Sequence, residues 1–241
     1  MSAGDGPLGF LPDHGRWVRH HDDLWTTHVG LSAIGTHFGR RATAVRSDRR
    51  WLIVGPVVPD DAARRELDDA GTVETLVVAS AVHNNFVPES VAAWPAARVL
   101  RTRGAKRDGI PPDRLDDLAS GLPAPFDASL HAIPIEGMPK INEVVFVHAP
   151  SRTLIVADLF FGIDARYPPW TRAVARLLGA YPGPGTSRVF RAFVRDRPAF
   201  VRSLDRILEH DLERLVTAHG AVFEDGARAA VERLRARFTN S

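Results

Sequence analysis

The chain has 241 residues, of which 44% are hydrophobic and 25% charged, so it can fill the core of one large domain or two small ones. Its 31 basic and 29 acidic residues leave a net charge of +2, and because the arginines are interleaved with acids the composition disfavours a nucleic-acid partner. The absence of cysteine excludes disulfides and thiolate metal sites, and without an apolar run of roughly 20 residues we expect a cytoplasmic protein with no membrane partner.

The N-terminal stretch predicts a tail followed by one domain. Residues 1–15 are rich in glycine and proline and lack the basic start and apolar stretch of a signal peptide. No long linker or strong repeat divides the rest of the chain. We therefore expect a flexible tail over 1–15 and a single domain over 16–241.

The first half of this domain predicts short strands separated by turns, over 24–29, 41–46 and 51–55. Asp60 opens a helix that we expect to continue to about Ala70, with Ala63 and Leu67 on its apolar face. Further along, the pattern predicts a strand over 75–80, a short helix over 88–95 and a strand over 97–102. Residues 104–128 contain four prolines and predict a long loop, which either covers a site or lies on the surface.

The second half mixes strands and helices in the same way. Strands are expected over 129–135, 143–148 and 153–158, the last two joined as a β-hairpin. Helices are expected over 170–180, from Pro198 onward and over 227–238, with a strand over 214–219 before the last one. Strands accompanied by helices in both halves predict a layered α/β (α+β) fold, with helices outside a sandwich of two sheets.

Three polar residues follow or end the most apolar of these strands: His83, Asp158 and His219. Ligands and catalytic groups of α/β folds gather at such strand ends. Two histidines and one carboxylate also form the usual protein ligands of a single transition-metal ion with open positions. Each residue alone has a structural explanation as well, since polar side chains commonly bond the backbone of a turn.

The segments around these residues resemble the motifs of the metallo-β-lactamase superfamily, from about Leu24 to Phe238. Residues 80–86 (Ser-Ala-Val-His-Asn-Asn-Phe) align with its T-H-x-H-x-D-H motif, residues 157–161 with its G-D-x-L-F motif, and residues 218–220 with its G-H-G motif. The resemblance implies an αββα sandwich with a metal site at one sheet edge. The chain also resembles an uncharacterised branch of that superfamily, in which the metal-binding motifs are degenerate.

The departures from these motifs reduce the number of metal ligands that the resemblance implies. Ala81, Asn85, Phe86 and Pro139 stand where the family carries metal ligands. The resemblance then implies one divalent ion, zinc, manganese or iron, instead of two. Its ligands would be His83, Asp158 and His219; Asp158 and Glu136 would be the catalytic groups, with Asn85, Glu89, Asn142 and Glu143 as further residues lining the site.

Two functions follow from this reduced site, and the sequence leaves both open. The first is a divergent hydrolase that acts on a small ester, lactone, amide or phosphoester, because a bound metal ion lowers the pKa of water. The second is a metal-free, non-catalytic protein that binds a small molecule or a protein partner in the cleft where the family holds its metal site. A third hypothesis, an iron site for oxygen chemistry, has the same ligand set but no other support in the sequence.

Overall fold

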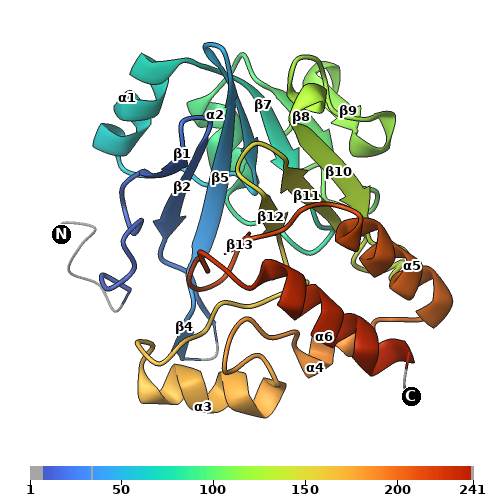
Figure 1. Cartoon of the computed structure of the whole chain (residues 1–241). Helices are drawn as coiled ribbons and strands as arrows, with labels where there is room; N and C mark the ends of the chain where they lie inside the picture. The colour runs from blue at the N-terminus through green and yellow to red at the C-terminus, as the bar shows by residue number, and fades with distance from the viewer. Residues whose placement is uncertain (1–7, 34, 240–241) are drawn as a thin grey trace.

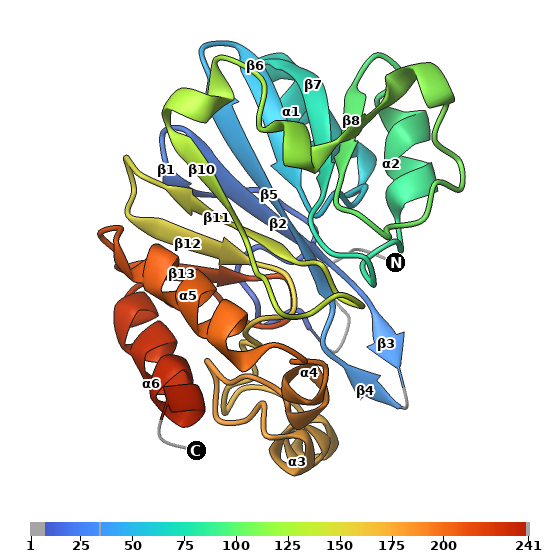
Figure 2. The same cartoon turned by 90° about the vertical axis from the view of Figure 1, so that its right-hand side faces the viewer.

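The computed structural model describes residues 8–33 and 35–239, and in them two β-sheets face each other between two layers of helices. Figure 1 shows α1 and α2 on one side of the molecule and α5 and α6 on the other, and Figure 2 shows the two sheets stacked between them. The predicted αββα sandwich is therefore confirmed.

The larger sheet has seven strands in the order β1-β2-β5-β6-β7-β8-β9, antiparallel as far as β6 and parallel from β6 to β9. The smaller sheet has the order β10-β11-β12-β13, and only its last pair is parallel. Strands β3 and β4 pair antiparallel as a separate two-stranded sheet. The strands are β1 (Val18–His21), β2 (Leu24–Val29), β3 (Ser32–Ala33), β4 (Thr36–His37), β5 (Arg40–Ser47), β6 (Arg50–Val54), β7 (Thr72–Val78), β8 (Arg98–Arg101), β9 (Leu115–Asp117), β10 (Leu130–Pro134), β11 (Val144–His148), β12 (Thr153–Val156) and β13 (Arg214–Thr217).

Helices α1 and α5 begin at capping residues that the sequence provides. Asp60 accepts a hydrogen bond from the backbone N–H of Ala63 at the start of α1, and Asp196 accepts one from Ala199 at the start of α5. No helix in the described part of the chain is long and apolar enough to cross a bilayer. The helices are α1 (Asp61–Ala70), α2 (Val87–Ala93), α3 (Pro169–Leu178), α4 (Arg188–Ala192), α5 (Arg197–Leu208) and α6 (Ala227–Thr239), with short 3-10 turns at Pro112–Arg114, Leu118–Ser120 and Phe126–Ala128.

Three apolar layers hold the sandwich together. The middle layer lies between the two sheets and includes Leu52 and Phe146, both fully buried. Trp51 and Leu67 belong to the layer under α1 and α2, and Phe200 to the layer under α5 and α6. Burial of large side chains on both faces of each sheet supplies most of the stability of such a fold.

The structure contains β1, β3, β4 and α4, which the sequence pattern did not predict, and it differs from the prediction in two further segments. Within the predicted tail, Leu8 and Leu11 are buried and Asp13 pairs with Arg41, so residues 8–15 pack against the domain; residues 1–7 lie outside the described residues. Within the predicted loop 104–128, residues Leu115–Asp117 form β9 at the edge of the larger sheet. The prolines on both sides of this short strand predicted a loop. An edge strand nevertheless tolerates neighbouring prolines, so the strand can form.

Three strand ends meet at one edge of the sandwich. Strands β12 and β13 run parallel, with Val156 beside Thr217, so the residues after them leave the sheet side by side. Strand β7 belongs to the other sheet, but the backbone N–H of Val144 donates to the carbonyl of Ala79 and joins the two sheets there. This edge is where the residues singled out from the sequence come together.

Candidate metal centre

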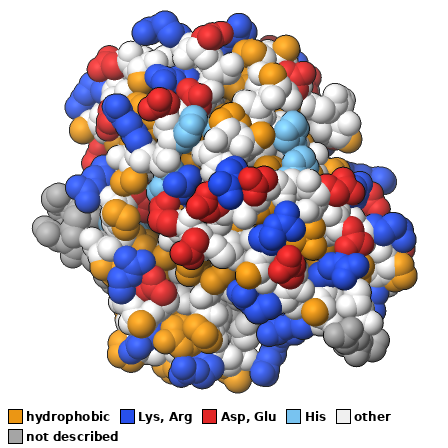
Figure 3. Space-filling view, in the orientation of Figure 1, with side chains coloured by type: hydrophobic (Ala, Val, Ile, Leu, Met, Phe, Trp, Pro, Cys, Tyr) orange, Lys and Arg blue, Asp and Glu red, His pale blue; other side chains and the backbone are white. Residues whose placement is uncertain are grey.

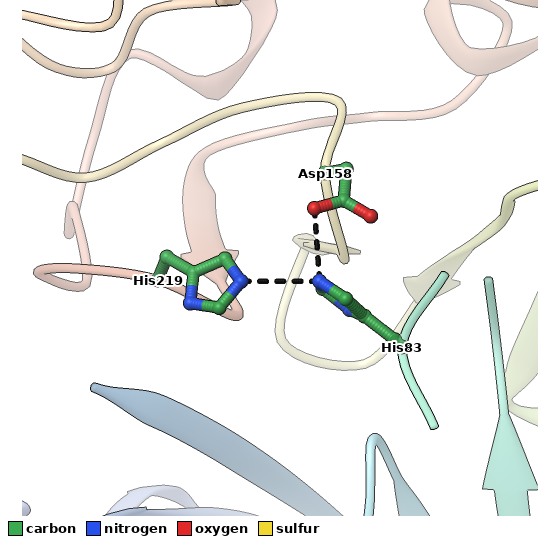
Figure 4. Close-up of side chains that lie close together, drawn as sticks. All are labelled: His83, Asp158 and His219. Carbon is green, nitrogen blue, oxygen red and sulfur yellow. Dashed lines mark hydrogen bonds and ion pairs between the residues drawn. The ribbon is translucent and has the colours of Figure 1, made fainter. Parts of the chain in front are cut away.

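His83, Asp158 and His219 point toward one another across the edge of the sandwich (Figure 4). His83 Nε2 lies 2.8 Å from Asp158 Oδ1 and 3.0 Å from His219 Nε2. One ligand atom from each residue falls within 4.8 Å of the other two. Side chains separated by 75 and 61 residues along the chain are thus gathered at one point by the ends of β7, β12 and β13.

A tight turn after β13 positions His219. Gly220 has a φ of +106°, and a Cβ at that residue would lie 2.3 Å from the backbone of Gly162, so only glycine fits. The backbone N–H of Gly162 donates to the carbonyl of His219 at 2.7 Å and fixes the close approach. The aromatic ring of Phe161 then stacks on the imidazole of His219, and Phe38 meets it edge-on.

The protonation of His219 is set by its second nitrogen. Nδ1 lies 2.6 Å from the carbonyl oxygen of Gly39, which can only accept, so Nδ1 carries the proton and Nε2 presents a lone pair. Burial, followed by the charges of His83 and Arg40, lowers the pKa of His219 to about 3. A neutral imidazole whose outer nitrogen is bonded to a carbonyl is the usual form of a metal-binding histidine.

The buried carboxyl group of Glu143 positions Asp158. Its two oxygens accept hydrogen bonds from the backbone N–H groups of Ala157, Asp158 and Leu159, at 2.8 to 3.3 Å, and so shape the turn after β12. Burial, and then repulsion from Asp158, raise the pKa of Glu143 to about 8, although the three N–H groups act in the opposite direction.

Asp158 itself is ionised. Burial acts to raise the pKa of Asp158, but the neighbouring His83, His219 and Arg40 together hold it well below its usual range. Its second oxygen, Oδ2, accepts a hydrogen bond of 3.2 Å from the hydroxyl of Ser80. Asp158 therefore presents Oδ1 to the two histidines as a charged ligand atom.

The third candidate ligand, His83, contacts a buried arginine. The guanidinium Nη1 of Arg40, at the start of β5, contacts Nδ1 of His83. Arg40 is only 3% exposed, and burial lowers the pKa of its guanidinium to about 10, so it stays charged at neutral pH. Burial and the Arg40 charge also lower the pKa of His83. The cationic Arg40 therefore lies directly behind one of the three converging ligands.

A second buried arginine braces the turn that carries His219. Arg41 donates to both oxygens of Asp13 and also to the backbone carbonyls of Thr217 and Gly220, at 2.7 and 2.5 Å. Burial acts to raise the pKa of Asp13, but Arg41 lowers it well below its usual value. This ion pair links the N-terminal segment to the end of β13.

The chemistry of the three side chains fits one divalent ion. Neutral imidazole nitrogens and a carboxylate oxygen suit zinc, iron and manganese, and three protein ligands leave open positions as in catalytic sites. Ligand atoms that share one ion lie about 3 to 4 Å apart, close to the spacing of this group. The outer hydrogen-bond partners also fit at His219, which faces the Gly39 carbonyl, and at Asp158, which accepts from Ser80. The outer nitrogen of His83 instead faces a donor, Arg40, where a metal ligand would need an acceptor.

The other residues expected at the site are not among the three that converge. Glu136, expected to be catalytic, pairs with Arg206 of α5 at 2.9 Å and is not part of the converging group. Asn85 and Glu89 are exposed. Asn142 bonds the carbonyl of Pro139 through its side chain.

Sequence reasoning missed Arg40 and Ser80 as site residues and gave no positioning role to Glu143. Arg40 precedes a second arginine at a strand start, where both read as exposed charges. Ser80 lies inside the aligned 80–86 segment, so its distance from Asp158 could have been anticipated. No pattern in the sequence marks Glu143 as a carboxylate that accepts three N–H groups.

No model of a known protein family matches the chain, and no curated protein matches its sequence. Solved structures do match. A metallo-beta-lactamase from Pontibacter korlensis superposes with a TM-score of 0.61 at 10% identity, over 94% of this chain and 99% of that one. A metallo-beta-lactamase from Erythrobacter litoralis gives 0.60 at 13% identity, over 93% and 92% of the two chains.

A third similar structure, a variant of a flavo di-iron protein from Thermotoga maritima, gives a TM-score of 0.62 at 11% identity, over 92% of this chain and 62% of that one. The similarity thus extends to proteins named for β-lactam and for di-iron chemistry. In all three comparisons, the alignment covers nearly the whole of this chain. The chain therefore has the metallo-β-lactamase fold, as its motifs and strand ends predicted.

Proposed function

We propose that the protein is a metal-dependent hydrolase whose single divalent ion is held by His83, Asp158 and His219. The observation that supports this proposal is the convergence of one ligand atom from each residue within 4.8 Å, at the edge of a metallo-β-lactamase fold. A divalent ion at such a site supplies a Lewis acid and lowers the pKa of water near it. Its substrate would be a small ester, lactone, amide or phosphoester.

Each residue of the site would have a distinct role. His219 and His83 would hold the ion through neutral nitrogens, since burial keeps their pKa values below the ordinary value. Asp158 would supply the negative ligand atom, and as the one carboxylate of the converging group it would be placed to orient water. Phe38 and Phe161 flank His219 and exclude bulk water from that side.

Hydrolysis of a substrate panel tests this proposal. The panel consists of p-nitrophenyl acetate, a γ-lactone and bis(p-nitrophenyl) phosphate, with chelator-treated protein reloaded with zinc, manganese or iron. Activity that requires the metal, is lost in Asp158→Asn and is retained in Glu136→Gln supports the proposal. Activity that is equal without metal, or equal in Asp158→Asn, contradicts it. Glu136→Gln is the matched control because it removes a carboxylate paired with Arg206 outside the site.

The second candidate function is a metal-free binding protein, and Arg40 is the observation that favours it. With Arg40 donating to Nδ1 of His83, the proton of His83 lies on Nε2 and can be donated to Asp158. The positive charge of Arg40 and the negative charge of Asp158 then balance without any ion. If no metal binds to the native chain, this function replaces the hydrolase.

A further inference from the structure

The segment from Ala165 to Arg195 differs in charge from the rest of the chain. It contains six arginines, at 166, 172, 176, 188, 191 and 195, and no acidic residue. Because the whole chain has a net charge of +2, the residues outside this segment have a net charge of −4. The segment includes all of α3 and α4, which lie together at one end of the molecule (Figure 1).

Helix α3 has an apolar face that no other described element covers. Its buried side is formed by Thr171 and Ala175, which face the domain. Trp170 and Leu177 are 59% and 71% exposed, although they are among the largest apolar side chains of the segment. Residues 170, 173, 174 and 177 fall on one side of a helix, so this second apolar stripe faces outward, away from the buried one.

Arginines surround the outward stripe. Arg172 and Arg176 lie on α3 itself, and Arg188 and Arg191 lie at its C-terminal end, where a Cβ on Gly179 would be 3.1 Å and 3.4 Å from their side chains. In the described part of the chain, Arg166 is the one arginine of the six with an ion-pair partner, Asp164.

Neighbouring guanidinium groups at this end repel one another. Burial, and then the charges of Arg237 and Arg188, lower the pKa of Arg191. A favourable interaction with the C-terminal end of the α3 dipole explains one or two of these arginines but not the whole set. Figure 3 shows hydrophobic and basic side chains side by side at the end of the molecule where α3 lies.

We propose that this α3–α4 surface, formed by Trp170, Leu177, Leu178, Val189 and the arginines around them, binds the surface of an anionic lipid bilayer. An exposed stripe with Trp and Leu beside arginines is the composition of helices that lie at a membrane interface. The apolar tips enter the headgroup region while the guanidinium groups meet lipid phosphates.

A second copy of the chain fits this surface less well, because a symmetric contact would bring two sets of arginines together. The proposal departs from the expectation of no membrane partner, which rested on the lack of a spanning segment. It does not depend on the metal site.

Sedimentation of the full chain with lipid vesicles tests the proposal. The vesicles are phosphatidylcholine alone or phosphatidylcholine mixed with phosphatidylglycerol. We expect binding only to the mixed vesicles, and weaker binding as salt screens the charges. Each arginine near an anionic surface contributes about a five-fold change in affinity, so Arg172→Gln with Arg176→Gln should weaken binding about 25-fold.

Two measurements serve as controls. Arg65→Gln with Arg202→Gln removes the same charge from exposed positions of α1 and α5, and should leave vesicle binding nearly unchanged. Trp170 is the one exposed tryptophan, since Trp17, Trp25, Trp51 and Trp94 are at most 6% exposed. Its fluorescence should therefore shift to shorter wavelength on mixed vesicles, and Trp170→Ala should weaken binding without changing the unfolding temperature.

The outcomes that overturn the proposal are distinct. No binding to mixed vesicles rejects it outright, even if an acidic protein is later found on this surface. Equal binding to both kinds of vesicle, or an equal loss in the control variant, rejects the role of the α3–α4 arginines. A dimer in light scattering that Trp170→Ala dissociates would assign the surface to a second copy instead.

Discussion

The guanidinium of Arg40 contacts Nδ1 of His83, on the side of the imidazole that faces away from Asp158 and His219. A guanidinium donates hydrogen bonds and accepts none, so Nδ1 accepts and the imidazole proton lies on Nε2. Nε2 is also the atom that a metal ion would need. Arg40 therefore favours the metal-free arrangement of the site and opposes loading of the ion.

Replacing Arg40 should strengthen metal binding. In Arg40→Gln the side-chain carbonyl can accept a hydrogen bond from Nδ1–H, which frees Nε2 as a ligand. Because such outer partners change metal affinity by about 10- to 100-fold, we expect zinc to bind at least about tenfold more tightly in isothermal titration. Arg40→Lys keeps the donor and the charge and should not gain affinity. Equal affinity in both variants would show that Arg40 does not oppose the ion.

Glu143 is expected to act through the backbone that presents Asp158. In Glu143→Gln an amide N–H₂ replaces one acceptor oxygen, so at least one of the N–H groups of Ala157, Asp158 and Leu159 loses its partner. The cost of such a buried, unpaired group is about 1–3 kcal/mol. Urea unfolding measures it, with Glu136→Gln as the exposed control. A variant as stable as the native chain would show that the hydrogen bonds from these N–H groups to Glu143 are not needed for stability.

The buried pair of Asp13 and Arg41 should be one of the most sensitive contacts outside the core. Asp13→Ala leaves the guanidinium of Arg41 buried without its counter-charge, which costs about 3–5 kcal/mol. The matched change at the exposed pair of Asp116 and Arg98, Asp116→Ala, should alter stability little. Thermal unfolding of both variants compares them. Equal losses would mean that residues 8–15 contribute no more than a surface contact.

Stability should fall as the pH is lowered from about 6.5 toward 4. Burial, then the charge of His21, lowers the pKa of His148 to about 4 in the folded chain, against 6.5 when unfolded. Between these values the unfolded chain binds the extra proton, so stability is complete above the unfolded pKa and is lost as the pH falls. His148→Asn should flatten this part of the profile by about 3 kcal/mol. An unchanged slope would show that other groups cause the acid dependence.

The fold and the grouping of the three candidate ligands were predictable, because they depend on periodic apolar runs and on which residue follows each run. Strand ends at 75–80, 153–158 and 214–219 identified His83, Asp158 and His219 before any contact was known. Arg40 was not predictable, since burial of a charge depends on what packs around it. The roles of Glu143 and of residues 8–15 also depend on tertiary contacts, with Asp158 and with Arg41.

Metal binding by the native chain tests the central claim most directly. Chelator-treated protein would be titrated with zinc beside His83→Ala, His219→Ala and, as a control, His131→Ala, which removes a histidine that stacks on His210 outside the group. The account predicts one equivalent of zinc per chain in the native protein and in His131→Ala, and none in the other two variants. No bound zinc in the native protein, or binding that survives His219→Ala, would contradict it.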